Sequence, residues 1–414
     1  MSVIGDPRSQ PGALIVGGAH VSLAIARSLG RHGIPVWLMA NHPLPRYSRY
    51  VERSFDWPGA DHPNGSSSII DVVTEHGLNG WVLIATGDQD MAMVARNHAM
   101  FSAHLRVPTA DWQTIRWVYD KHLTYERAAT LGIDVPRSFR LREPAALDRL
   151  DCRFPVVLKP ATRKGDDEFT LAKAWKADDR AALLDLYPRA AALVGADAVI
   201  LQEWIPGAGE AQFSYAGLWN NGAPVASLVA RRTRQHPIDF GRSSSFVETI
   251  DCPAVAKIAE RFLKSIDYCG VAEIEFKQDK RDGRYRLLDV NGRFWTWCGL
   301  ASTAGVDFPY LIYCQALGLP LTPGQCTPGL AWLHASRDIV AAAQEMSRGT
   351  MRFGDYMRGL TRIRCFASFA TDDPLPAFAE IPVAVGNRLF GGYGRAASAS
   401  APKTVNTSGL RSRL

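Results

Sequence analysis

Cysteine is scarce in this sequence, and its spacing excludes the small scaffolds held together by disulfides or zinc. The seven cysteines among 414 residues are scattered, and no two stand in a C-x-x-C arrangement. The ten histidines are also dispersed, and none falls in the H-E-x-x-H spacing that places two imidazoles on one helix face. We therefore interpret each histidine as structural or solvated and expect no zinc site.

Long apolar runs are also missing. No stretch of about 18 apolar residues occurs, so no membrane span is expected. The first thirty residues lack the basic start and continuous apolar core of an export signal, which predicts a cytoplasmic protein. With 414 residues, 47% of them hydrophobic, the chain can bury two or three packed units.

Positive charge is concentrated at one end of the chain. The net charge is +6, but residues 388–414 hold five basic residues and no acid, which leaves +1 for the rest. That end is rich in alanine, serine and glycine, so we expect a disordered basic tail over 387–414. The body has no basic footprint of the kind that nucleic acids require, and no nucleic-acid partner is expected.

The N-terminal region alternates strands and helices. Apolar runs at 13–16, 35–39 and 81–85 are separated by helical spacing, which predicts a parallel α/β sheet and a Rossmann-like domain over residues 1–110. The turn after the first run reads G-G-A-H-V-S and lacks the spacing of G-x-G-x-x-G. A structural turn is favoured there, and a nicotinamide or flavin site is the alternative.

From residue 111 the pattern changes to longer strands that follow one another more directly. A helix is expected near 120–131. Strand candidates lie at 154–159, 198–203, 211–219 and 224–230. This pattern predicts an α+β region with antiparallel sheets.

The most informative stretch is 271–297, which reads as two alternating strands joined by residues 280–284. A two-residue turn ending at Gly283 would put Glu275 and Asp289 on opposite faces of the hairpin. A three-residue loop over Arg281 to Gly283, with its glycine left-handed, places them opposite each other on one face. Only the second register separates polar from apolar side chains.

In that register Glu273 also faces Asn291, so one face collects three carboxylates and an amide. The other face would enter a core through Ile274, Phe276, Leu288 and Val290. Hard oxygen ligands of this kind suit Mg²⁺, which proteins hold by one or two carboxylates together with phosphate oxygens and water. The competing interpretation is a solvated polar face on an edge hairpin.

The second strand, Leu288-Asp289-Val290-Asn291-Gly292-Arg293, resembles the metal-binding strand of ATP-grasp enzymes, which usually reads Glu-x-Asn-Pro-Arg. Aspartate replaces glutamate and glycine replaces proline, but the carboxylate remains. The resemblance implies that Glu275, Asp289 and Asn291 hold Mg²⁺ or Mn²⁺. It also implies that Arg293 stabilises the transferred phosphoryl group.

Other stretches resemble the same family in the expected order. Lys121 and Lys159 resemble the lysines that approach the ATP phosphates; alone, a surface lysine on a helix is the simpler interpretation of Lys121. Leu201-Gln202-Glu203-Trp204-Ile205-Pro206-Gly207 resembles the hinge that clamps ATP. Three residues of the hinge region are implied to contact the adenine, Gln202 by its side chain and Glu203 and Ile205 by their backbones. Glu210 is implied to hold the ribose.

Two features bear on turnover and on the substrate. The phosphate-covering loop should follow Lys159, yet residues 161–168 contain a single glycine, and Arg163 or Lys164 would have to supply charge instead. Residues 230–243 resemble the substrate loop of carboxylate-amine ligase-like members. Arginine suits bidentate capture of a carboxylate, and Arg232 and Arg234 are the candidates.

The resemblance therefore implies an ATP-dependent ligase that joins a carboxylate to an amine, or to a thiol, through an acyl phosphate. Its partners would be small-molecule substrates, and a homodimer is left open. A pre-ATP-grasp domain over 1–110, a two-lobed ATP-grasp domain over 111–320 and an α/β extension over 321–386 are expected. The alternatives are an NAD(P)-dependent oxidoreductase and a non-catalytic nucleotide-binding regulator. The sequence leaves the acid, the acceptor and the pathway open.

Overall fold

The computed structural model describes residues 10–139, 147, 149–162, 167–207, 209–238, 243–389 and 404–405. Arg163 and Lys164, which were expected to supply charge to the phosphate loop, lie outside the described residues. So does most of the expected basic tail. The mixed α/β fold expected from the sequence is confirmed, and its strands form three sheets.

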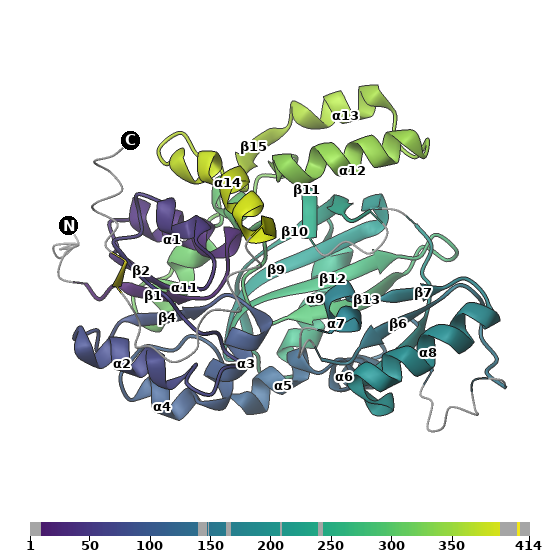
Figure 1. Ribbon diagram of the computed structural model, residues 1–414, viewed down its shortest axis with the longest axis horizontal. Helices are drawn as coiled ribbons and strands as arrows, with labels where there is room; N and C mark the ends of the chain where they lie inside the picture. Colours follow the sequence, from purple (N-terminus) through teal and green to yellow (C-terminus); the bar gives the residue numbers. More distant parts are fainter. Residues whose placement is uncertain are drawn as a thin grey trace.

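The first sheet contains the parallel strands β1 (Ala13–Val16), β2 (Val36–Met39), β3 (Arg53–Phe55) and β4 (Val82–Ala85), in the order β3-β2-β1-β4. The short strand β16 (Thr404–Val405) joins its edge beside β3. Helices cover both faces (Figure 1): α1 (His20–Arg31) lies on one, and α2 (Ser67–Glu75), α3 (Asp88–Arg96) and α4 (His98–Ser102) lie on the other. The parallel pairing expected here is therefore present.

This coverage explains why β1, β2 and β4 are apolar without alternation, since both faces of each strand are buried. Leu14 and Val16 pack in the core beneath α2 and α3, while Ala13 and Ile15 pack in the core beneath α1.

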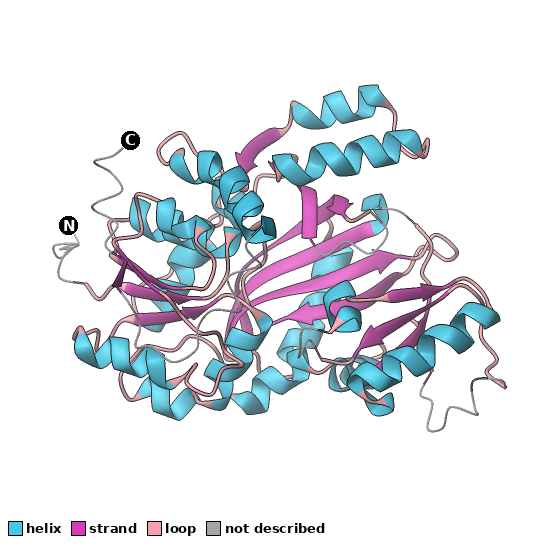
Figure 2. Ribbon diagram, in the orientation of Figure 1, coloured by secondary structure: helices cyan, strands magenta, loops and turns pink. Residues whose placement is uncertain are grey.

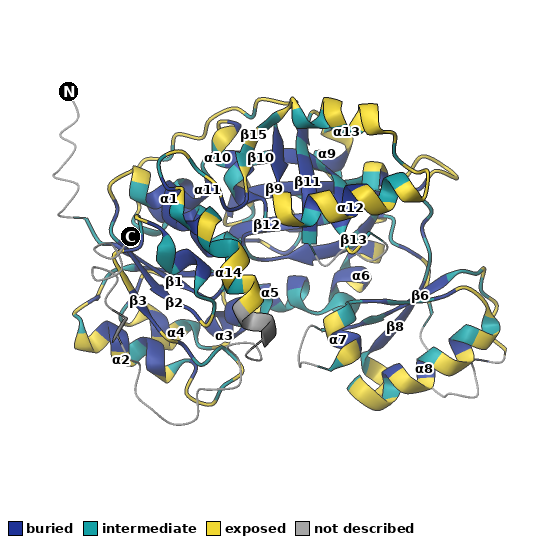
Figure 3. Ribbon diagram, turned by 45° about the horizontal axis from the view of Figure 1, so that its top comes forward, coloured by how far each residue is buried: buried dark blue, intermediate teal, exposed yellow. Residues whose placement is uncertain are grey.

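A smaller antiparallel sheet follows, with the order β5-β8-β6-β7. Its strands are β5 (Ser138–Phe139), β6 (Val156–Pro160), β7 (Trp175–Ala177) and β8 (Val199–Glu203). Helices α7 (Glu168–Ala172) and α8 (Arg180–Val194) accompany it, and α8 packs against β6, β7 and β8 around a core of its own. Figure 3 shows this unit standing apart from the larger sheet, with the outer face of α8 exposed.

The largest sheet has the order β13-β12-β9-β10-β11-β14-β15 and is antiparallel except between its last two strands. Its strands are β9 (Gln212–Asn220), β10 (Ala223–His236), β11 (Ser243–Ile250), β12 (Gly270–Gln278), β13 (Tyr285–Asn291), β14 (Ala331–Leu333) and β15 (Ile363–Phe366). Its long strands run through the middle of the molecule (Figure 2). Because β14 and β15 extend it, this sheet crosses the domain boundary expected at residue 320.

The remaining helices connect and cover these sheets. They are α5 (Trp112–Tyr119), α6 (Lys121–Thr130), α9 (Pro253–Lys264), α10 (Cys298–Thr303), α11 (Phe308–Ala316), α12 (Ala335–Ser347), α13 (Phe353–Leu360) and α14 (Leu375–Leu389). One short turn of 3-10 helix matters below, η5 (Gly209–Ala211). Among the described residues, no helix combines the length and apolarity needed to cross a bilayer.

Candidate active site in the cleft between the two antiparallel sheets

The β12–β13 hairpin has the register that segregates its side chains. Glu275 pairs with Asp289, and Glu273 pairs with Asn291, as the three-residue loop predicted. The loop itself is longer than predicted. The backbone N–H of Asp279 donates to the carbonyl of Arg284 at 2.8 Å, which leaves four residues between this pair.

A β-bulge in β13 compensates for the longer loop. Phe276 pairs with Leu287 whereas Glu275 pairs with Asp289, so Leu288 is the extra residue. Leu287, not Leu288, enters the core with Ile274 and Val290. Leu288 lies in the cleft instead, which corrects the expectation that it shares the buried face.

The acidic face of the hairpin borders a cleft with an empty volume of about 1040 Å³, open solvent at its mouth included. Both lobes contribute to its lining: Val157, Lys159, Gln202 and Glu203 come from the small sheet, and Arg232, Glu275, Lys277 and Asp289 come from the large one. Lys121, at the start of α6, also lines the cleft. The cleft thus brings Lys121 and Lys159 together with Glu275 and Asp289, as expected from the sequence.

Each cleft carboxylate is paired with a cation. Lys121 Nζ lies 2.7 Å from Asp289 Oδ1, and Arg232 Nη1 lies 2.6 Å from Glu275 Oε2. Opposed carboxylates repel each other in a sheet, and the two cations offset that repulsion. The Asp289 and Glu275 side chains remain 12% and 24% exposed, so a ligand in the cleft can reach them.

Behind this pair lies a sealed polar layer. Asn291 Nδ2 donates to Glu273 Oε2 at 3.3 Å and to Glu275 Oε1 at 3.4 Å, and Trp297 Nε1 donates to Glu273 Oε1 at 3.1 Å. Burial, and next the charge of Glu275, raise the pKa of the Glu273 carboxyl. Asn291 therefore orients Glu275, and it does not line the cleft itself.

Lys277 is a cleft residue that the sequence interpretation missed. Its Nζ lies 4.6 Å from the ring centre of Trp204, and its side chain lines the same cavity as Lys159. Burial, and next the charge of Lys159, lower the pKa of Lys277 to about 8. The alternation of β12 could have revealed it, since position 277 shares a face with Glu273 and Glu275.

The hinge residues also belong to this cleft. Gln202, Glu203 and Ile205 line it, whereas Glu210, in η5, does not. Gln202 is 1% exposed and donates to Ser138 Oγ at 3.0 Å, while its Oε1 has no hydrogen-bond partner among the described residues. Glu210 is half-exposed and pairs with Lys280 at 2.6 Å.

Arg234 points away from the cleft. It forms a two-pronged pair with Asp338 of α12 at 2.8 Å for both contacts, and the two side chains are 3% and 0% exposed. The reason is a bulge in β10: Arg231 pairs with Glu248 and Arg234 with Phe246, so the strand has one residue too many. Arg234, which was expected to bind substrate, is instead held in a buried ion pair.

Arg293 also lies outside the cleft lining. Its guanidinium bonds Asp88 of α3 at 2.7 and 3.2 Å, and its Nη2 donates to Asn291 Oδ1 at 3.3 Å. Arg293 thus ties the acidic hairpin to the first sheet's helices and holds the Asn291 amide. Its expected contact with a phosphoryl group stays a prediction.

The cleft chemistry fits a divalent cation. Glu275 and Asp289 present carboxylate oxygens from adjacent strands into one cavity, and such hard donors suit Mg²⁺. The lysines nearby suit the phosphates that normally complete the coordination of that ion.

The glycine turn of the first sheet is filled by the chain's own side chains. A Cβ on Gly17 would lie 2.0 Å from Asp90 Oδ2, and one on Gly18 would lie 2.5 Å from Thr86 Oγ1. The buried Asp90 carboxyl already lies against the backbone of this turn. A pyrophosphate therefore has neither space nor favourable charge there. The glycines are required for packing, which argues against the oxidoreductase alternative.

The chain is similar to proteins of known activity. No protein-family model matches the chain. It is similar to a D-aspartate ligase of Enterococcus faecium, with 24% identity over 231 residues that cover 51% of this chain and 53% of that ligase. The chain thus spans about half the length of this curated relative.

Two solved structures share the fold. An L-amino acid ligase from Bacillus licheniformis matches with a TM-score of 0.59 and 17% identity, over 77% of this chain and 78% of that chain. A biotin carboxylase from Campylobacter jejuni, solved as a β-γ-ATP complex, matches with a TM-score of 0.60 and 13% identity, over 79% of this chain and 75% of that chain. The predicted resemblance to ATP-grasp carboxylate-amine ligases is confirmed.

Proposed function

We propose that this protein is an ATP-dependent ligase that joins a carboxylate to an amine and releases ADP and phosphate. The observation that carries the proposal is the joint lining of one cleft by lysines from α6, β6 and β12 and by the opposed acids Glu275 and Asp289. Cationic side chains beside a carboxylate pair match the needs of a polyphosphate with its divalent cation.

The adenine would lie at the hinge. Gln202, Glu203 and Ile205 line the cleft, and Gln202 Oε1 is a buried acceptor that the amino group of an adenine could satisfy. Among the described residues, no hydrogen bond from the chain engages the backbone N–H of Ile205. Glu210 at the rim, beside Lys280, is the residue for the ribose.

The phosphates would meet Lys121, Lys159 and Lys277. Glu275 and Asp289 would hold Mg²⁺, with Asn291 orienting Glu275. When bound, the ion supplies charge neutralisation on the phosphate oxygens. Lys121 would then exchange its contact with Asp289 for a phosphate, because an ammonium binds either anion.

Arg232 is the residue for the carboxylate substrate. It is 7% exposed, lines the cleft, and is held by Ser244 Oγ at 2.9 Å and by Glu275. A carboxylate oxygen attacks the γ-phosphorus, the bond from that phosphorus to the β-γ bridging oxygen breaks, and ADP leaves. The amine nitrogen then attacks the carbonyl carbon, phosphate departs, and the nitrogen loses a proton. Positioning and charge neutralisation supply the catalysis.

The test is ADP release with Mg-ATP across a panel of amino acids and other carboxylates, each paired with amines. Release that needs one acid and one amine, together with the matching amide by mass spectrometry, is the expected result. Tight ATP binding without release for any pair would instead favour the non-catalytic regulator.

A further inference from the structure

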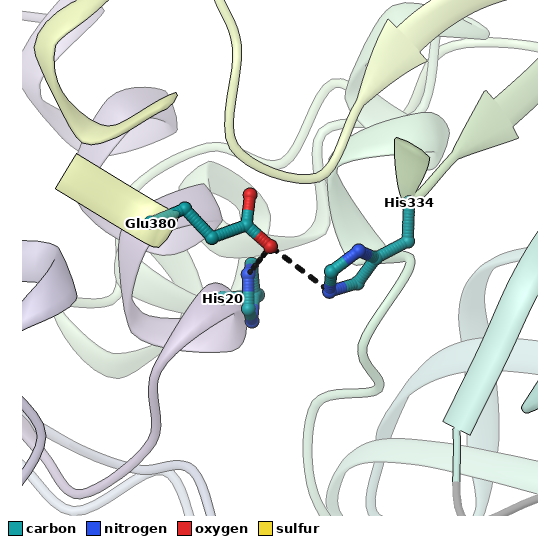
Figure 4. A group of neighbouring side chains, drawn as sticks. All are labelled: His20, His334 and Glu380. Carbon is teal, nitrogen blue, oxygen red and sulfur yellow. Dashed lines mark ion pairs between the residues drawn. The ribbon is translucent and has the colours of Figure 1, made fainter. Parts of the chain in front are cut away.

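A second polar cluster lies outside the lining of the cleft, where three parts of the chain that are distant in sequence meet. His20 begins α1, His334 directly follows β14, and Glu380 belongs to α14. Figure 4 shows the two imidazoles and the carboxylate directed toward one another. Their ligand atoms all lie within 4.8 Å of one another.

The distances within this cluster suit a shared ion better than hydrogen bonds. Glu380 Oε1 lies 3.5 Å from His20 Nε2 and 3.6 Å from His334 Nε2. Both are long for an N–H···O bond. Two ligands that sit about 2.0–2.1 Å from a tetrahedral Zn²⁺ are themselves about 3.3–3.4 Å apart.

The two nitrogens are also buried, and their ion pairs with Glu380 are too long to count as hydrogen bonds. Neither His20 Nε2 nor His334 Nε2 makes a hydrogen bond within the described residues. The His334 residue is 1% exposed. A buried polar atom left unsatisfied costs about 1–3 kcal/mol, so two of them facing one carboxylate indicate a missing ligand.

The surrounding hydrogen bonds prepare His334 as a ligand. Ser336 Oγ donates its only proton to Glu380 Oε1 at 3.0 Å, so toward His334 Nδ1, 3.2 Å away, it must accept. The proton of the neutral ring is then on Nδ1, and Nε2 carries the lone pair.

Glu380 is oriented in the same way. Ser368 Oγ donates to Glu380 Oε2 at 2.5 Å, and Oε1, which accepts from Ser336, faces the two imidazoles. Hydrogen-bonding partners of this kind fix the orientation of metal ligands. The cluster therefore has both a ligand set and its supporting contacts.

We propose that His20, His334 and Glu380 bind one divalent transition-metal ion, with Zn²⁺ the best match to two imidazoles and a carboxylate. The ion joins α1 of the first sheet to the segment after β14 and to α14, so it fastens the C-terminal helices to the N-terminal sheet. This site is independent of the proposed ligase activity and needs no nucleotide.

The test is calorimetric titration of Zn²⁺ into the full-length protein, free of any histidine tag and stripped of metal with a chelator. We expect one Zn²⁺ per chain. Glu380→Gln and His20→Asn should each weaken binding by at least about 100-fold, more than is lost with a residue that only hydrogen-bonds to a ligand. A rise in melting temperature on adding Zn²⁺ should occur in the wild type and vanish in both variants.

His32→Asn is the matched control, because His32 lies at the other end of α1 and pairs with a single carboxylate, Asp307, at 3.2 Å. It should bind Zn²⁺ like the wild type. Co²⁺ in place of Zn²⁺ should give the intense visible absorption of a four-coordinate site in the wild type and in His32→Asn, but in neither ligand variant. The proposal is overturned if the wild type binds no Zn²⁺, or if folded Glu380→Gln and His20→Asn bind it unchanged.

Discussion

Two ion pairs that begin on the same strand, β10, have opposite surroundings. Arg232 forms an ion pair with Glu275 in a cleft that ligands can enter. Arg234 forms an ion pair with Asp338 where both side chains are buried away from water. A ligand can replace one partner in the open pair, but nothing can enter the sealed pair without unfolding its surroundings. Open pairs are therefore available for chemistry, and sealed pairs hold elements together, here α12 on the large sheet.

The largest effect is expected in the cleft, at Asp289. Asp289→Asn removes one charge from the carboxylate pair and should lower Mg-ATP-dependent turnover by roughly 1000-fold, the upper range for loss of one electrostatic contact. Steady-state ADP release measures it. Asp282→Asn, at the exposed tip of the same hairpin, is the control and should retain near-wild-type activity.

The sealed pair should respond through stability. Arg234→Met leaves Asp338 buried without its partner and should lower the free energy of unfolding by about 3–5 kcal/mol. Denaturant unfolding measures the loss. Arg362→Met removes the exposed pair with Glu248 on the neighbouring strand and should cost no more than about 1 kcal/mol. Equal losses in the two variants would show that the buried ion pair contributes no more to stability than the exposed one.

Arg232→Met should show the reverse pattern. We expect turnover to fall by roughly 100-fold and the KM for the carboxylate substrate to rise, because its two-pronged donor is gone. The melting temperature should change less than in Arg234→Met. If Arg232→Met unfolds as readily as Arg234→Met and keeps its activity, Arg232 is a structural residue.

Lys277 should make ATP binding in the cleft depend on pH. Burial and Lys159 lower its pKa to about 8, so the free protein loses this charge as the pH rises through 8. Bound phosphate favours the protonated form, and the Kd for ATP should therefore rise about tenfold between pH 7 and 9. In Lys277→Arg the guanidinium stays charged, and the Kd should be nearly flat over that range.

The smallest effect is expected at the hairpin loop that sets the register of the acids. Gly283 has a φ of +72°, and no atom lies within 4 Å of the place that an alanine Cβ would take there. Gly283→Ala should therefore cost about 1 kcal/mol through backbone conformation alone. Gly354→Ala in α13 is the control and should not destabilise. A shift in the pairing of Glu275 and Asp289 would appear as lost turnover.

Local alternation predicted the acidic face of β12 and its partners on β13 correctly. The success depended on a bulge at Leu288 that offsets one extra loop residue, and neither departure is visible in the sequence pattern. In β10 an extra residue lies between Arg231 and Arg234, and the second register shift comes only after Arg234, so Arg234 is not on the same face as Arg232, with which the resemblance had grouped it. Bulges depend on pairing with neighbouring strands, and period-two patterns do not reveal them.

Contacts between residues far apart in the chain also could not be predicted from the sequence. The strand β15 lies beside β14 although a pair of helices separates them in the chain, and His20 meets His334 and Glu380 only through the folded arrangement. The sequence interpretation treated each histidine as structural because no local spacing joined them. Lys277, by contrast, could have been found from the alternation of its own strand.

The most direct test of the central claim is the ATP-dependent binding of Mn²⁺, measured by electron paramagnetic resonance. We expect one Mn²⁺ per chain that binds only when ATP is present, and its loss in a folded Glu275→Gln/Asp289→Asn double variant. Unchanged ATP-dependent Mn²⁺ binding in that variant would show that the two opposed carboxylates are not the metal ligands.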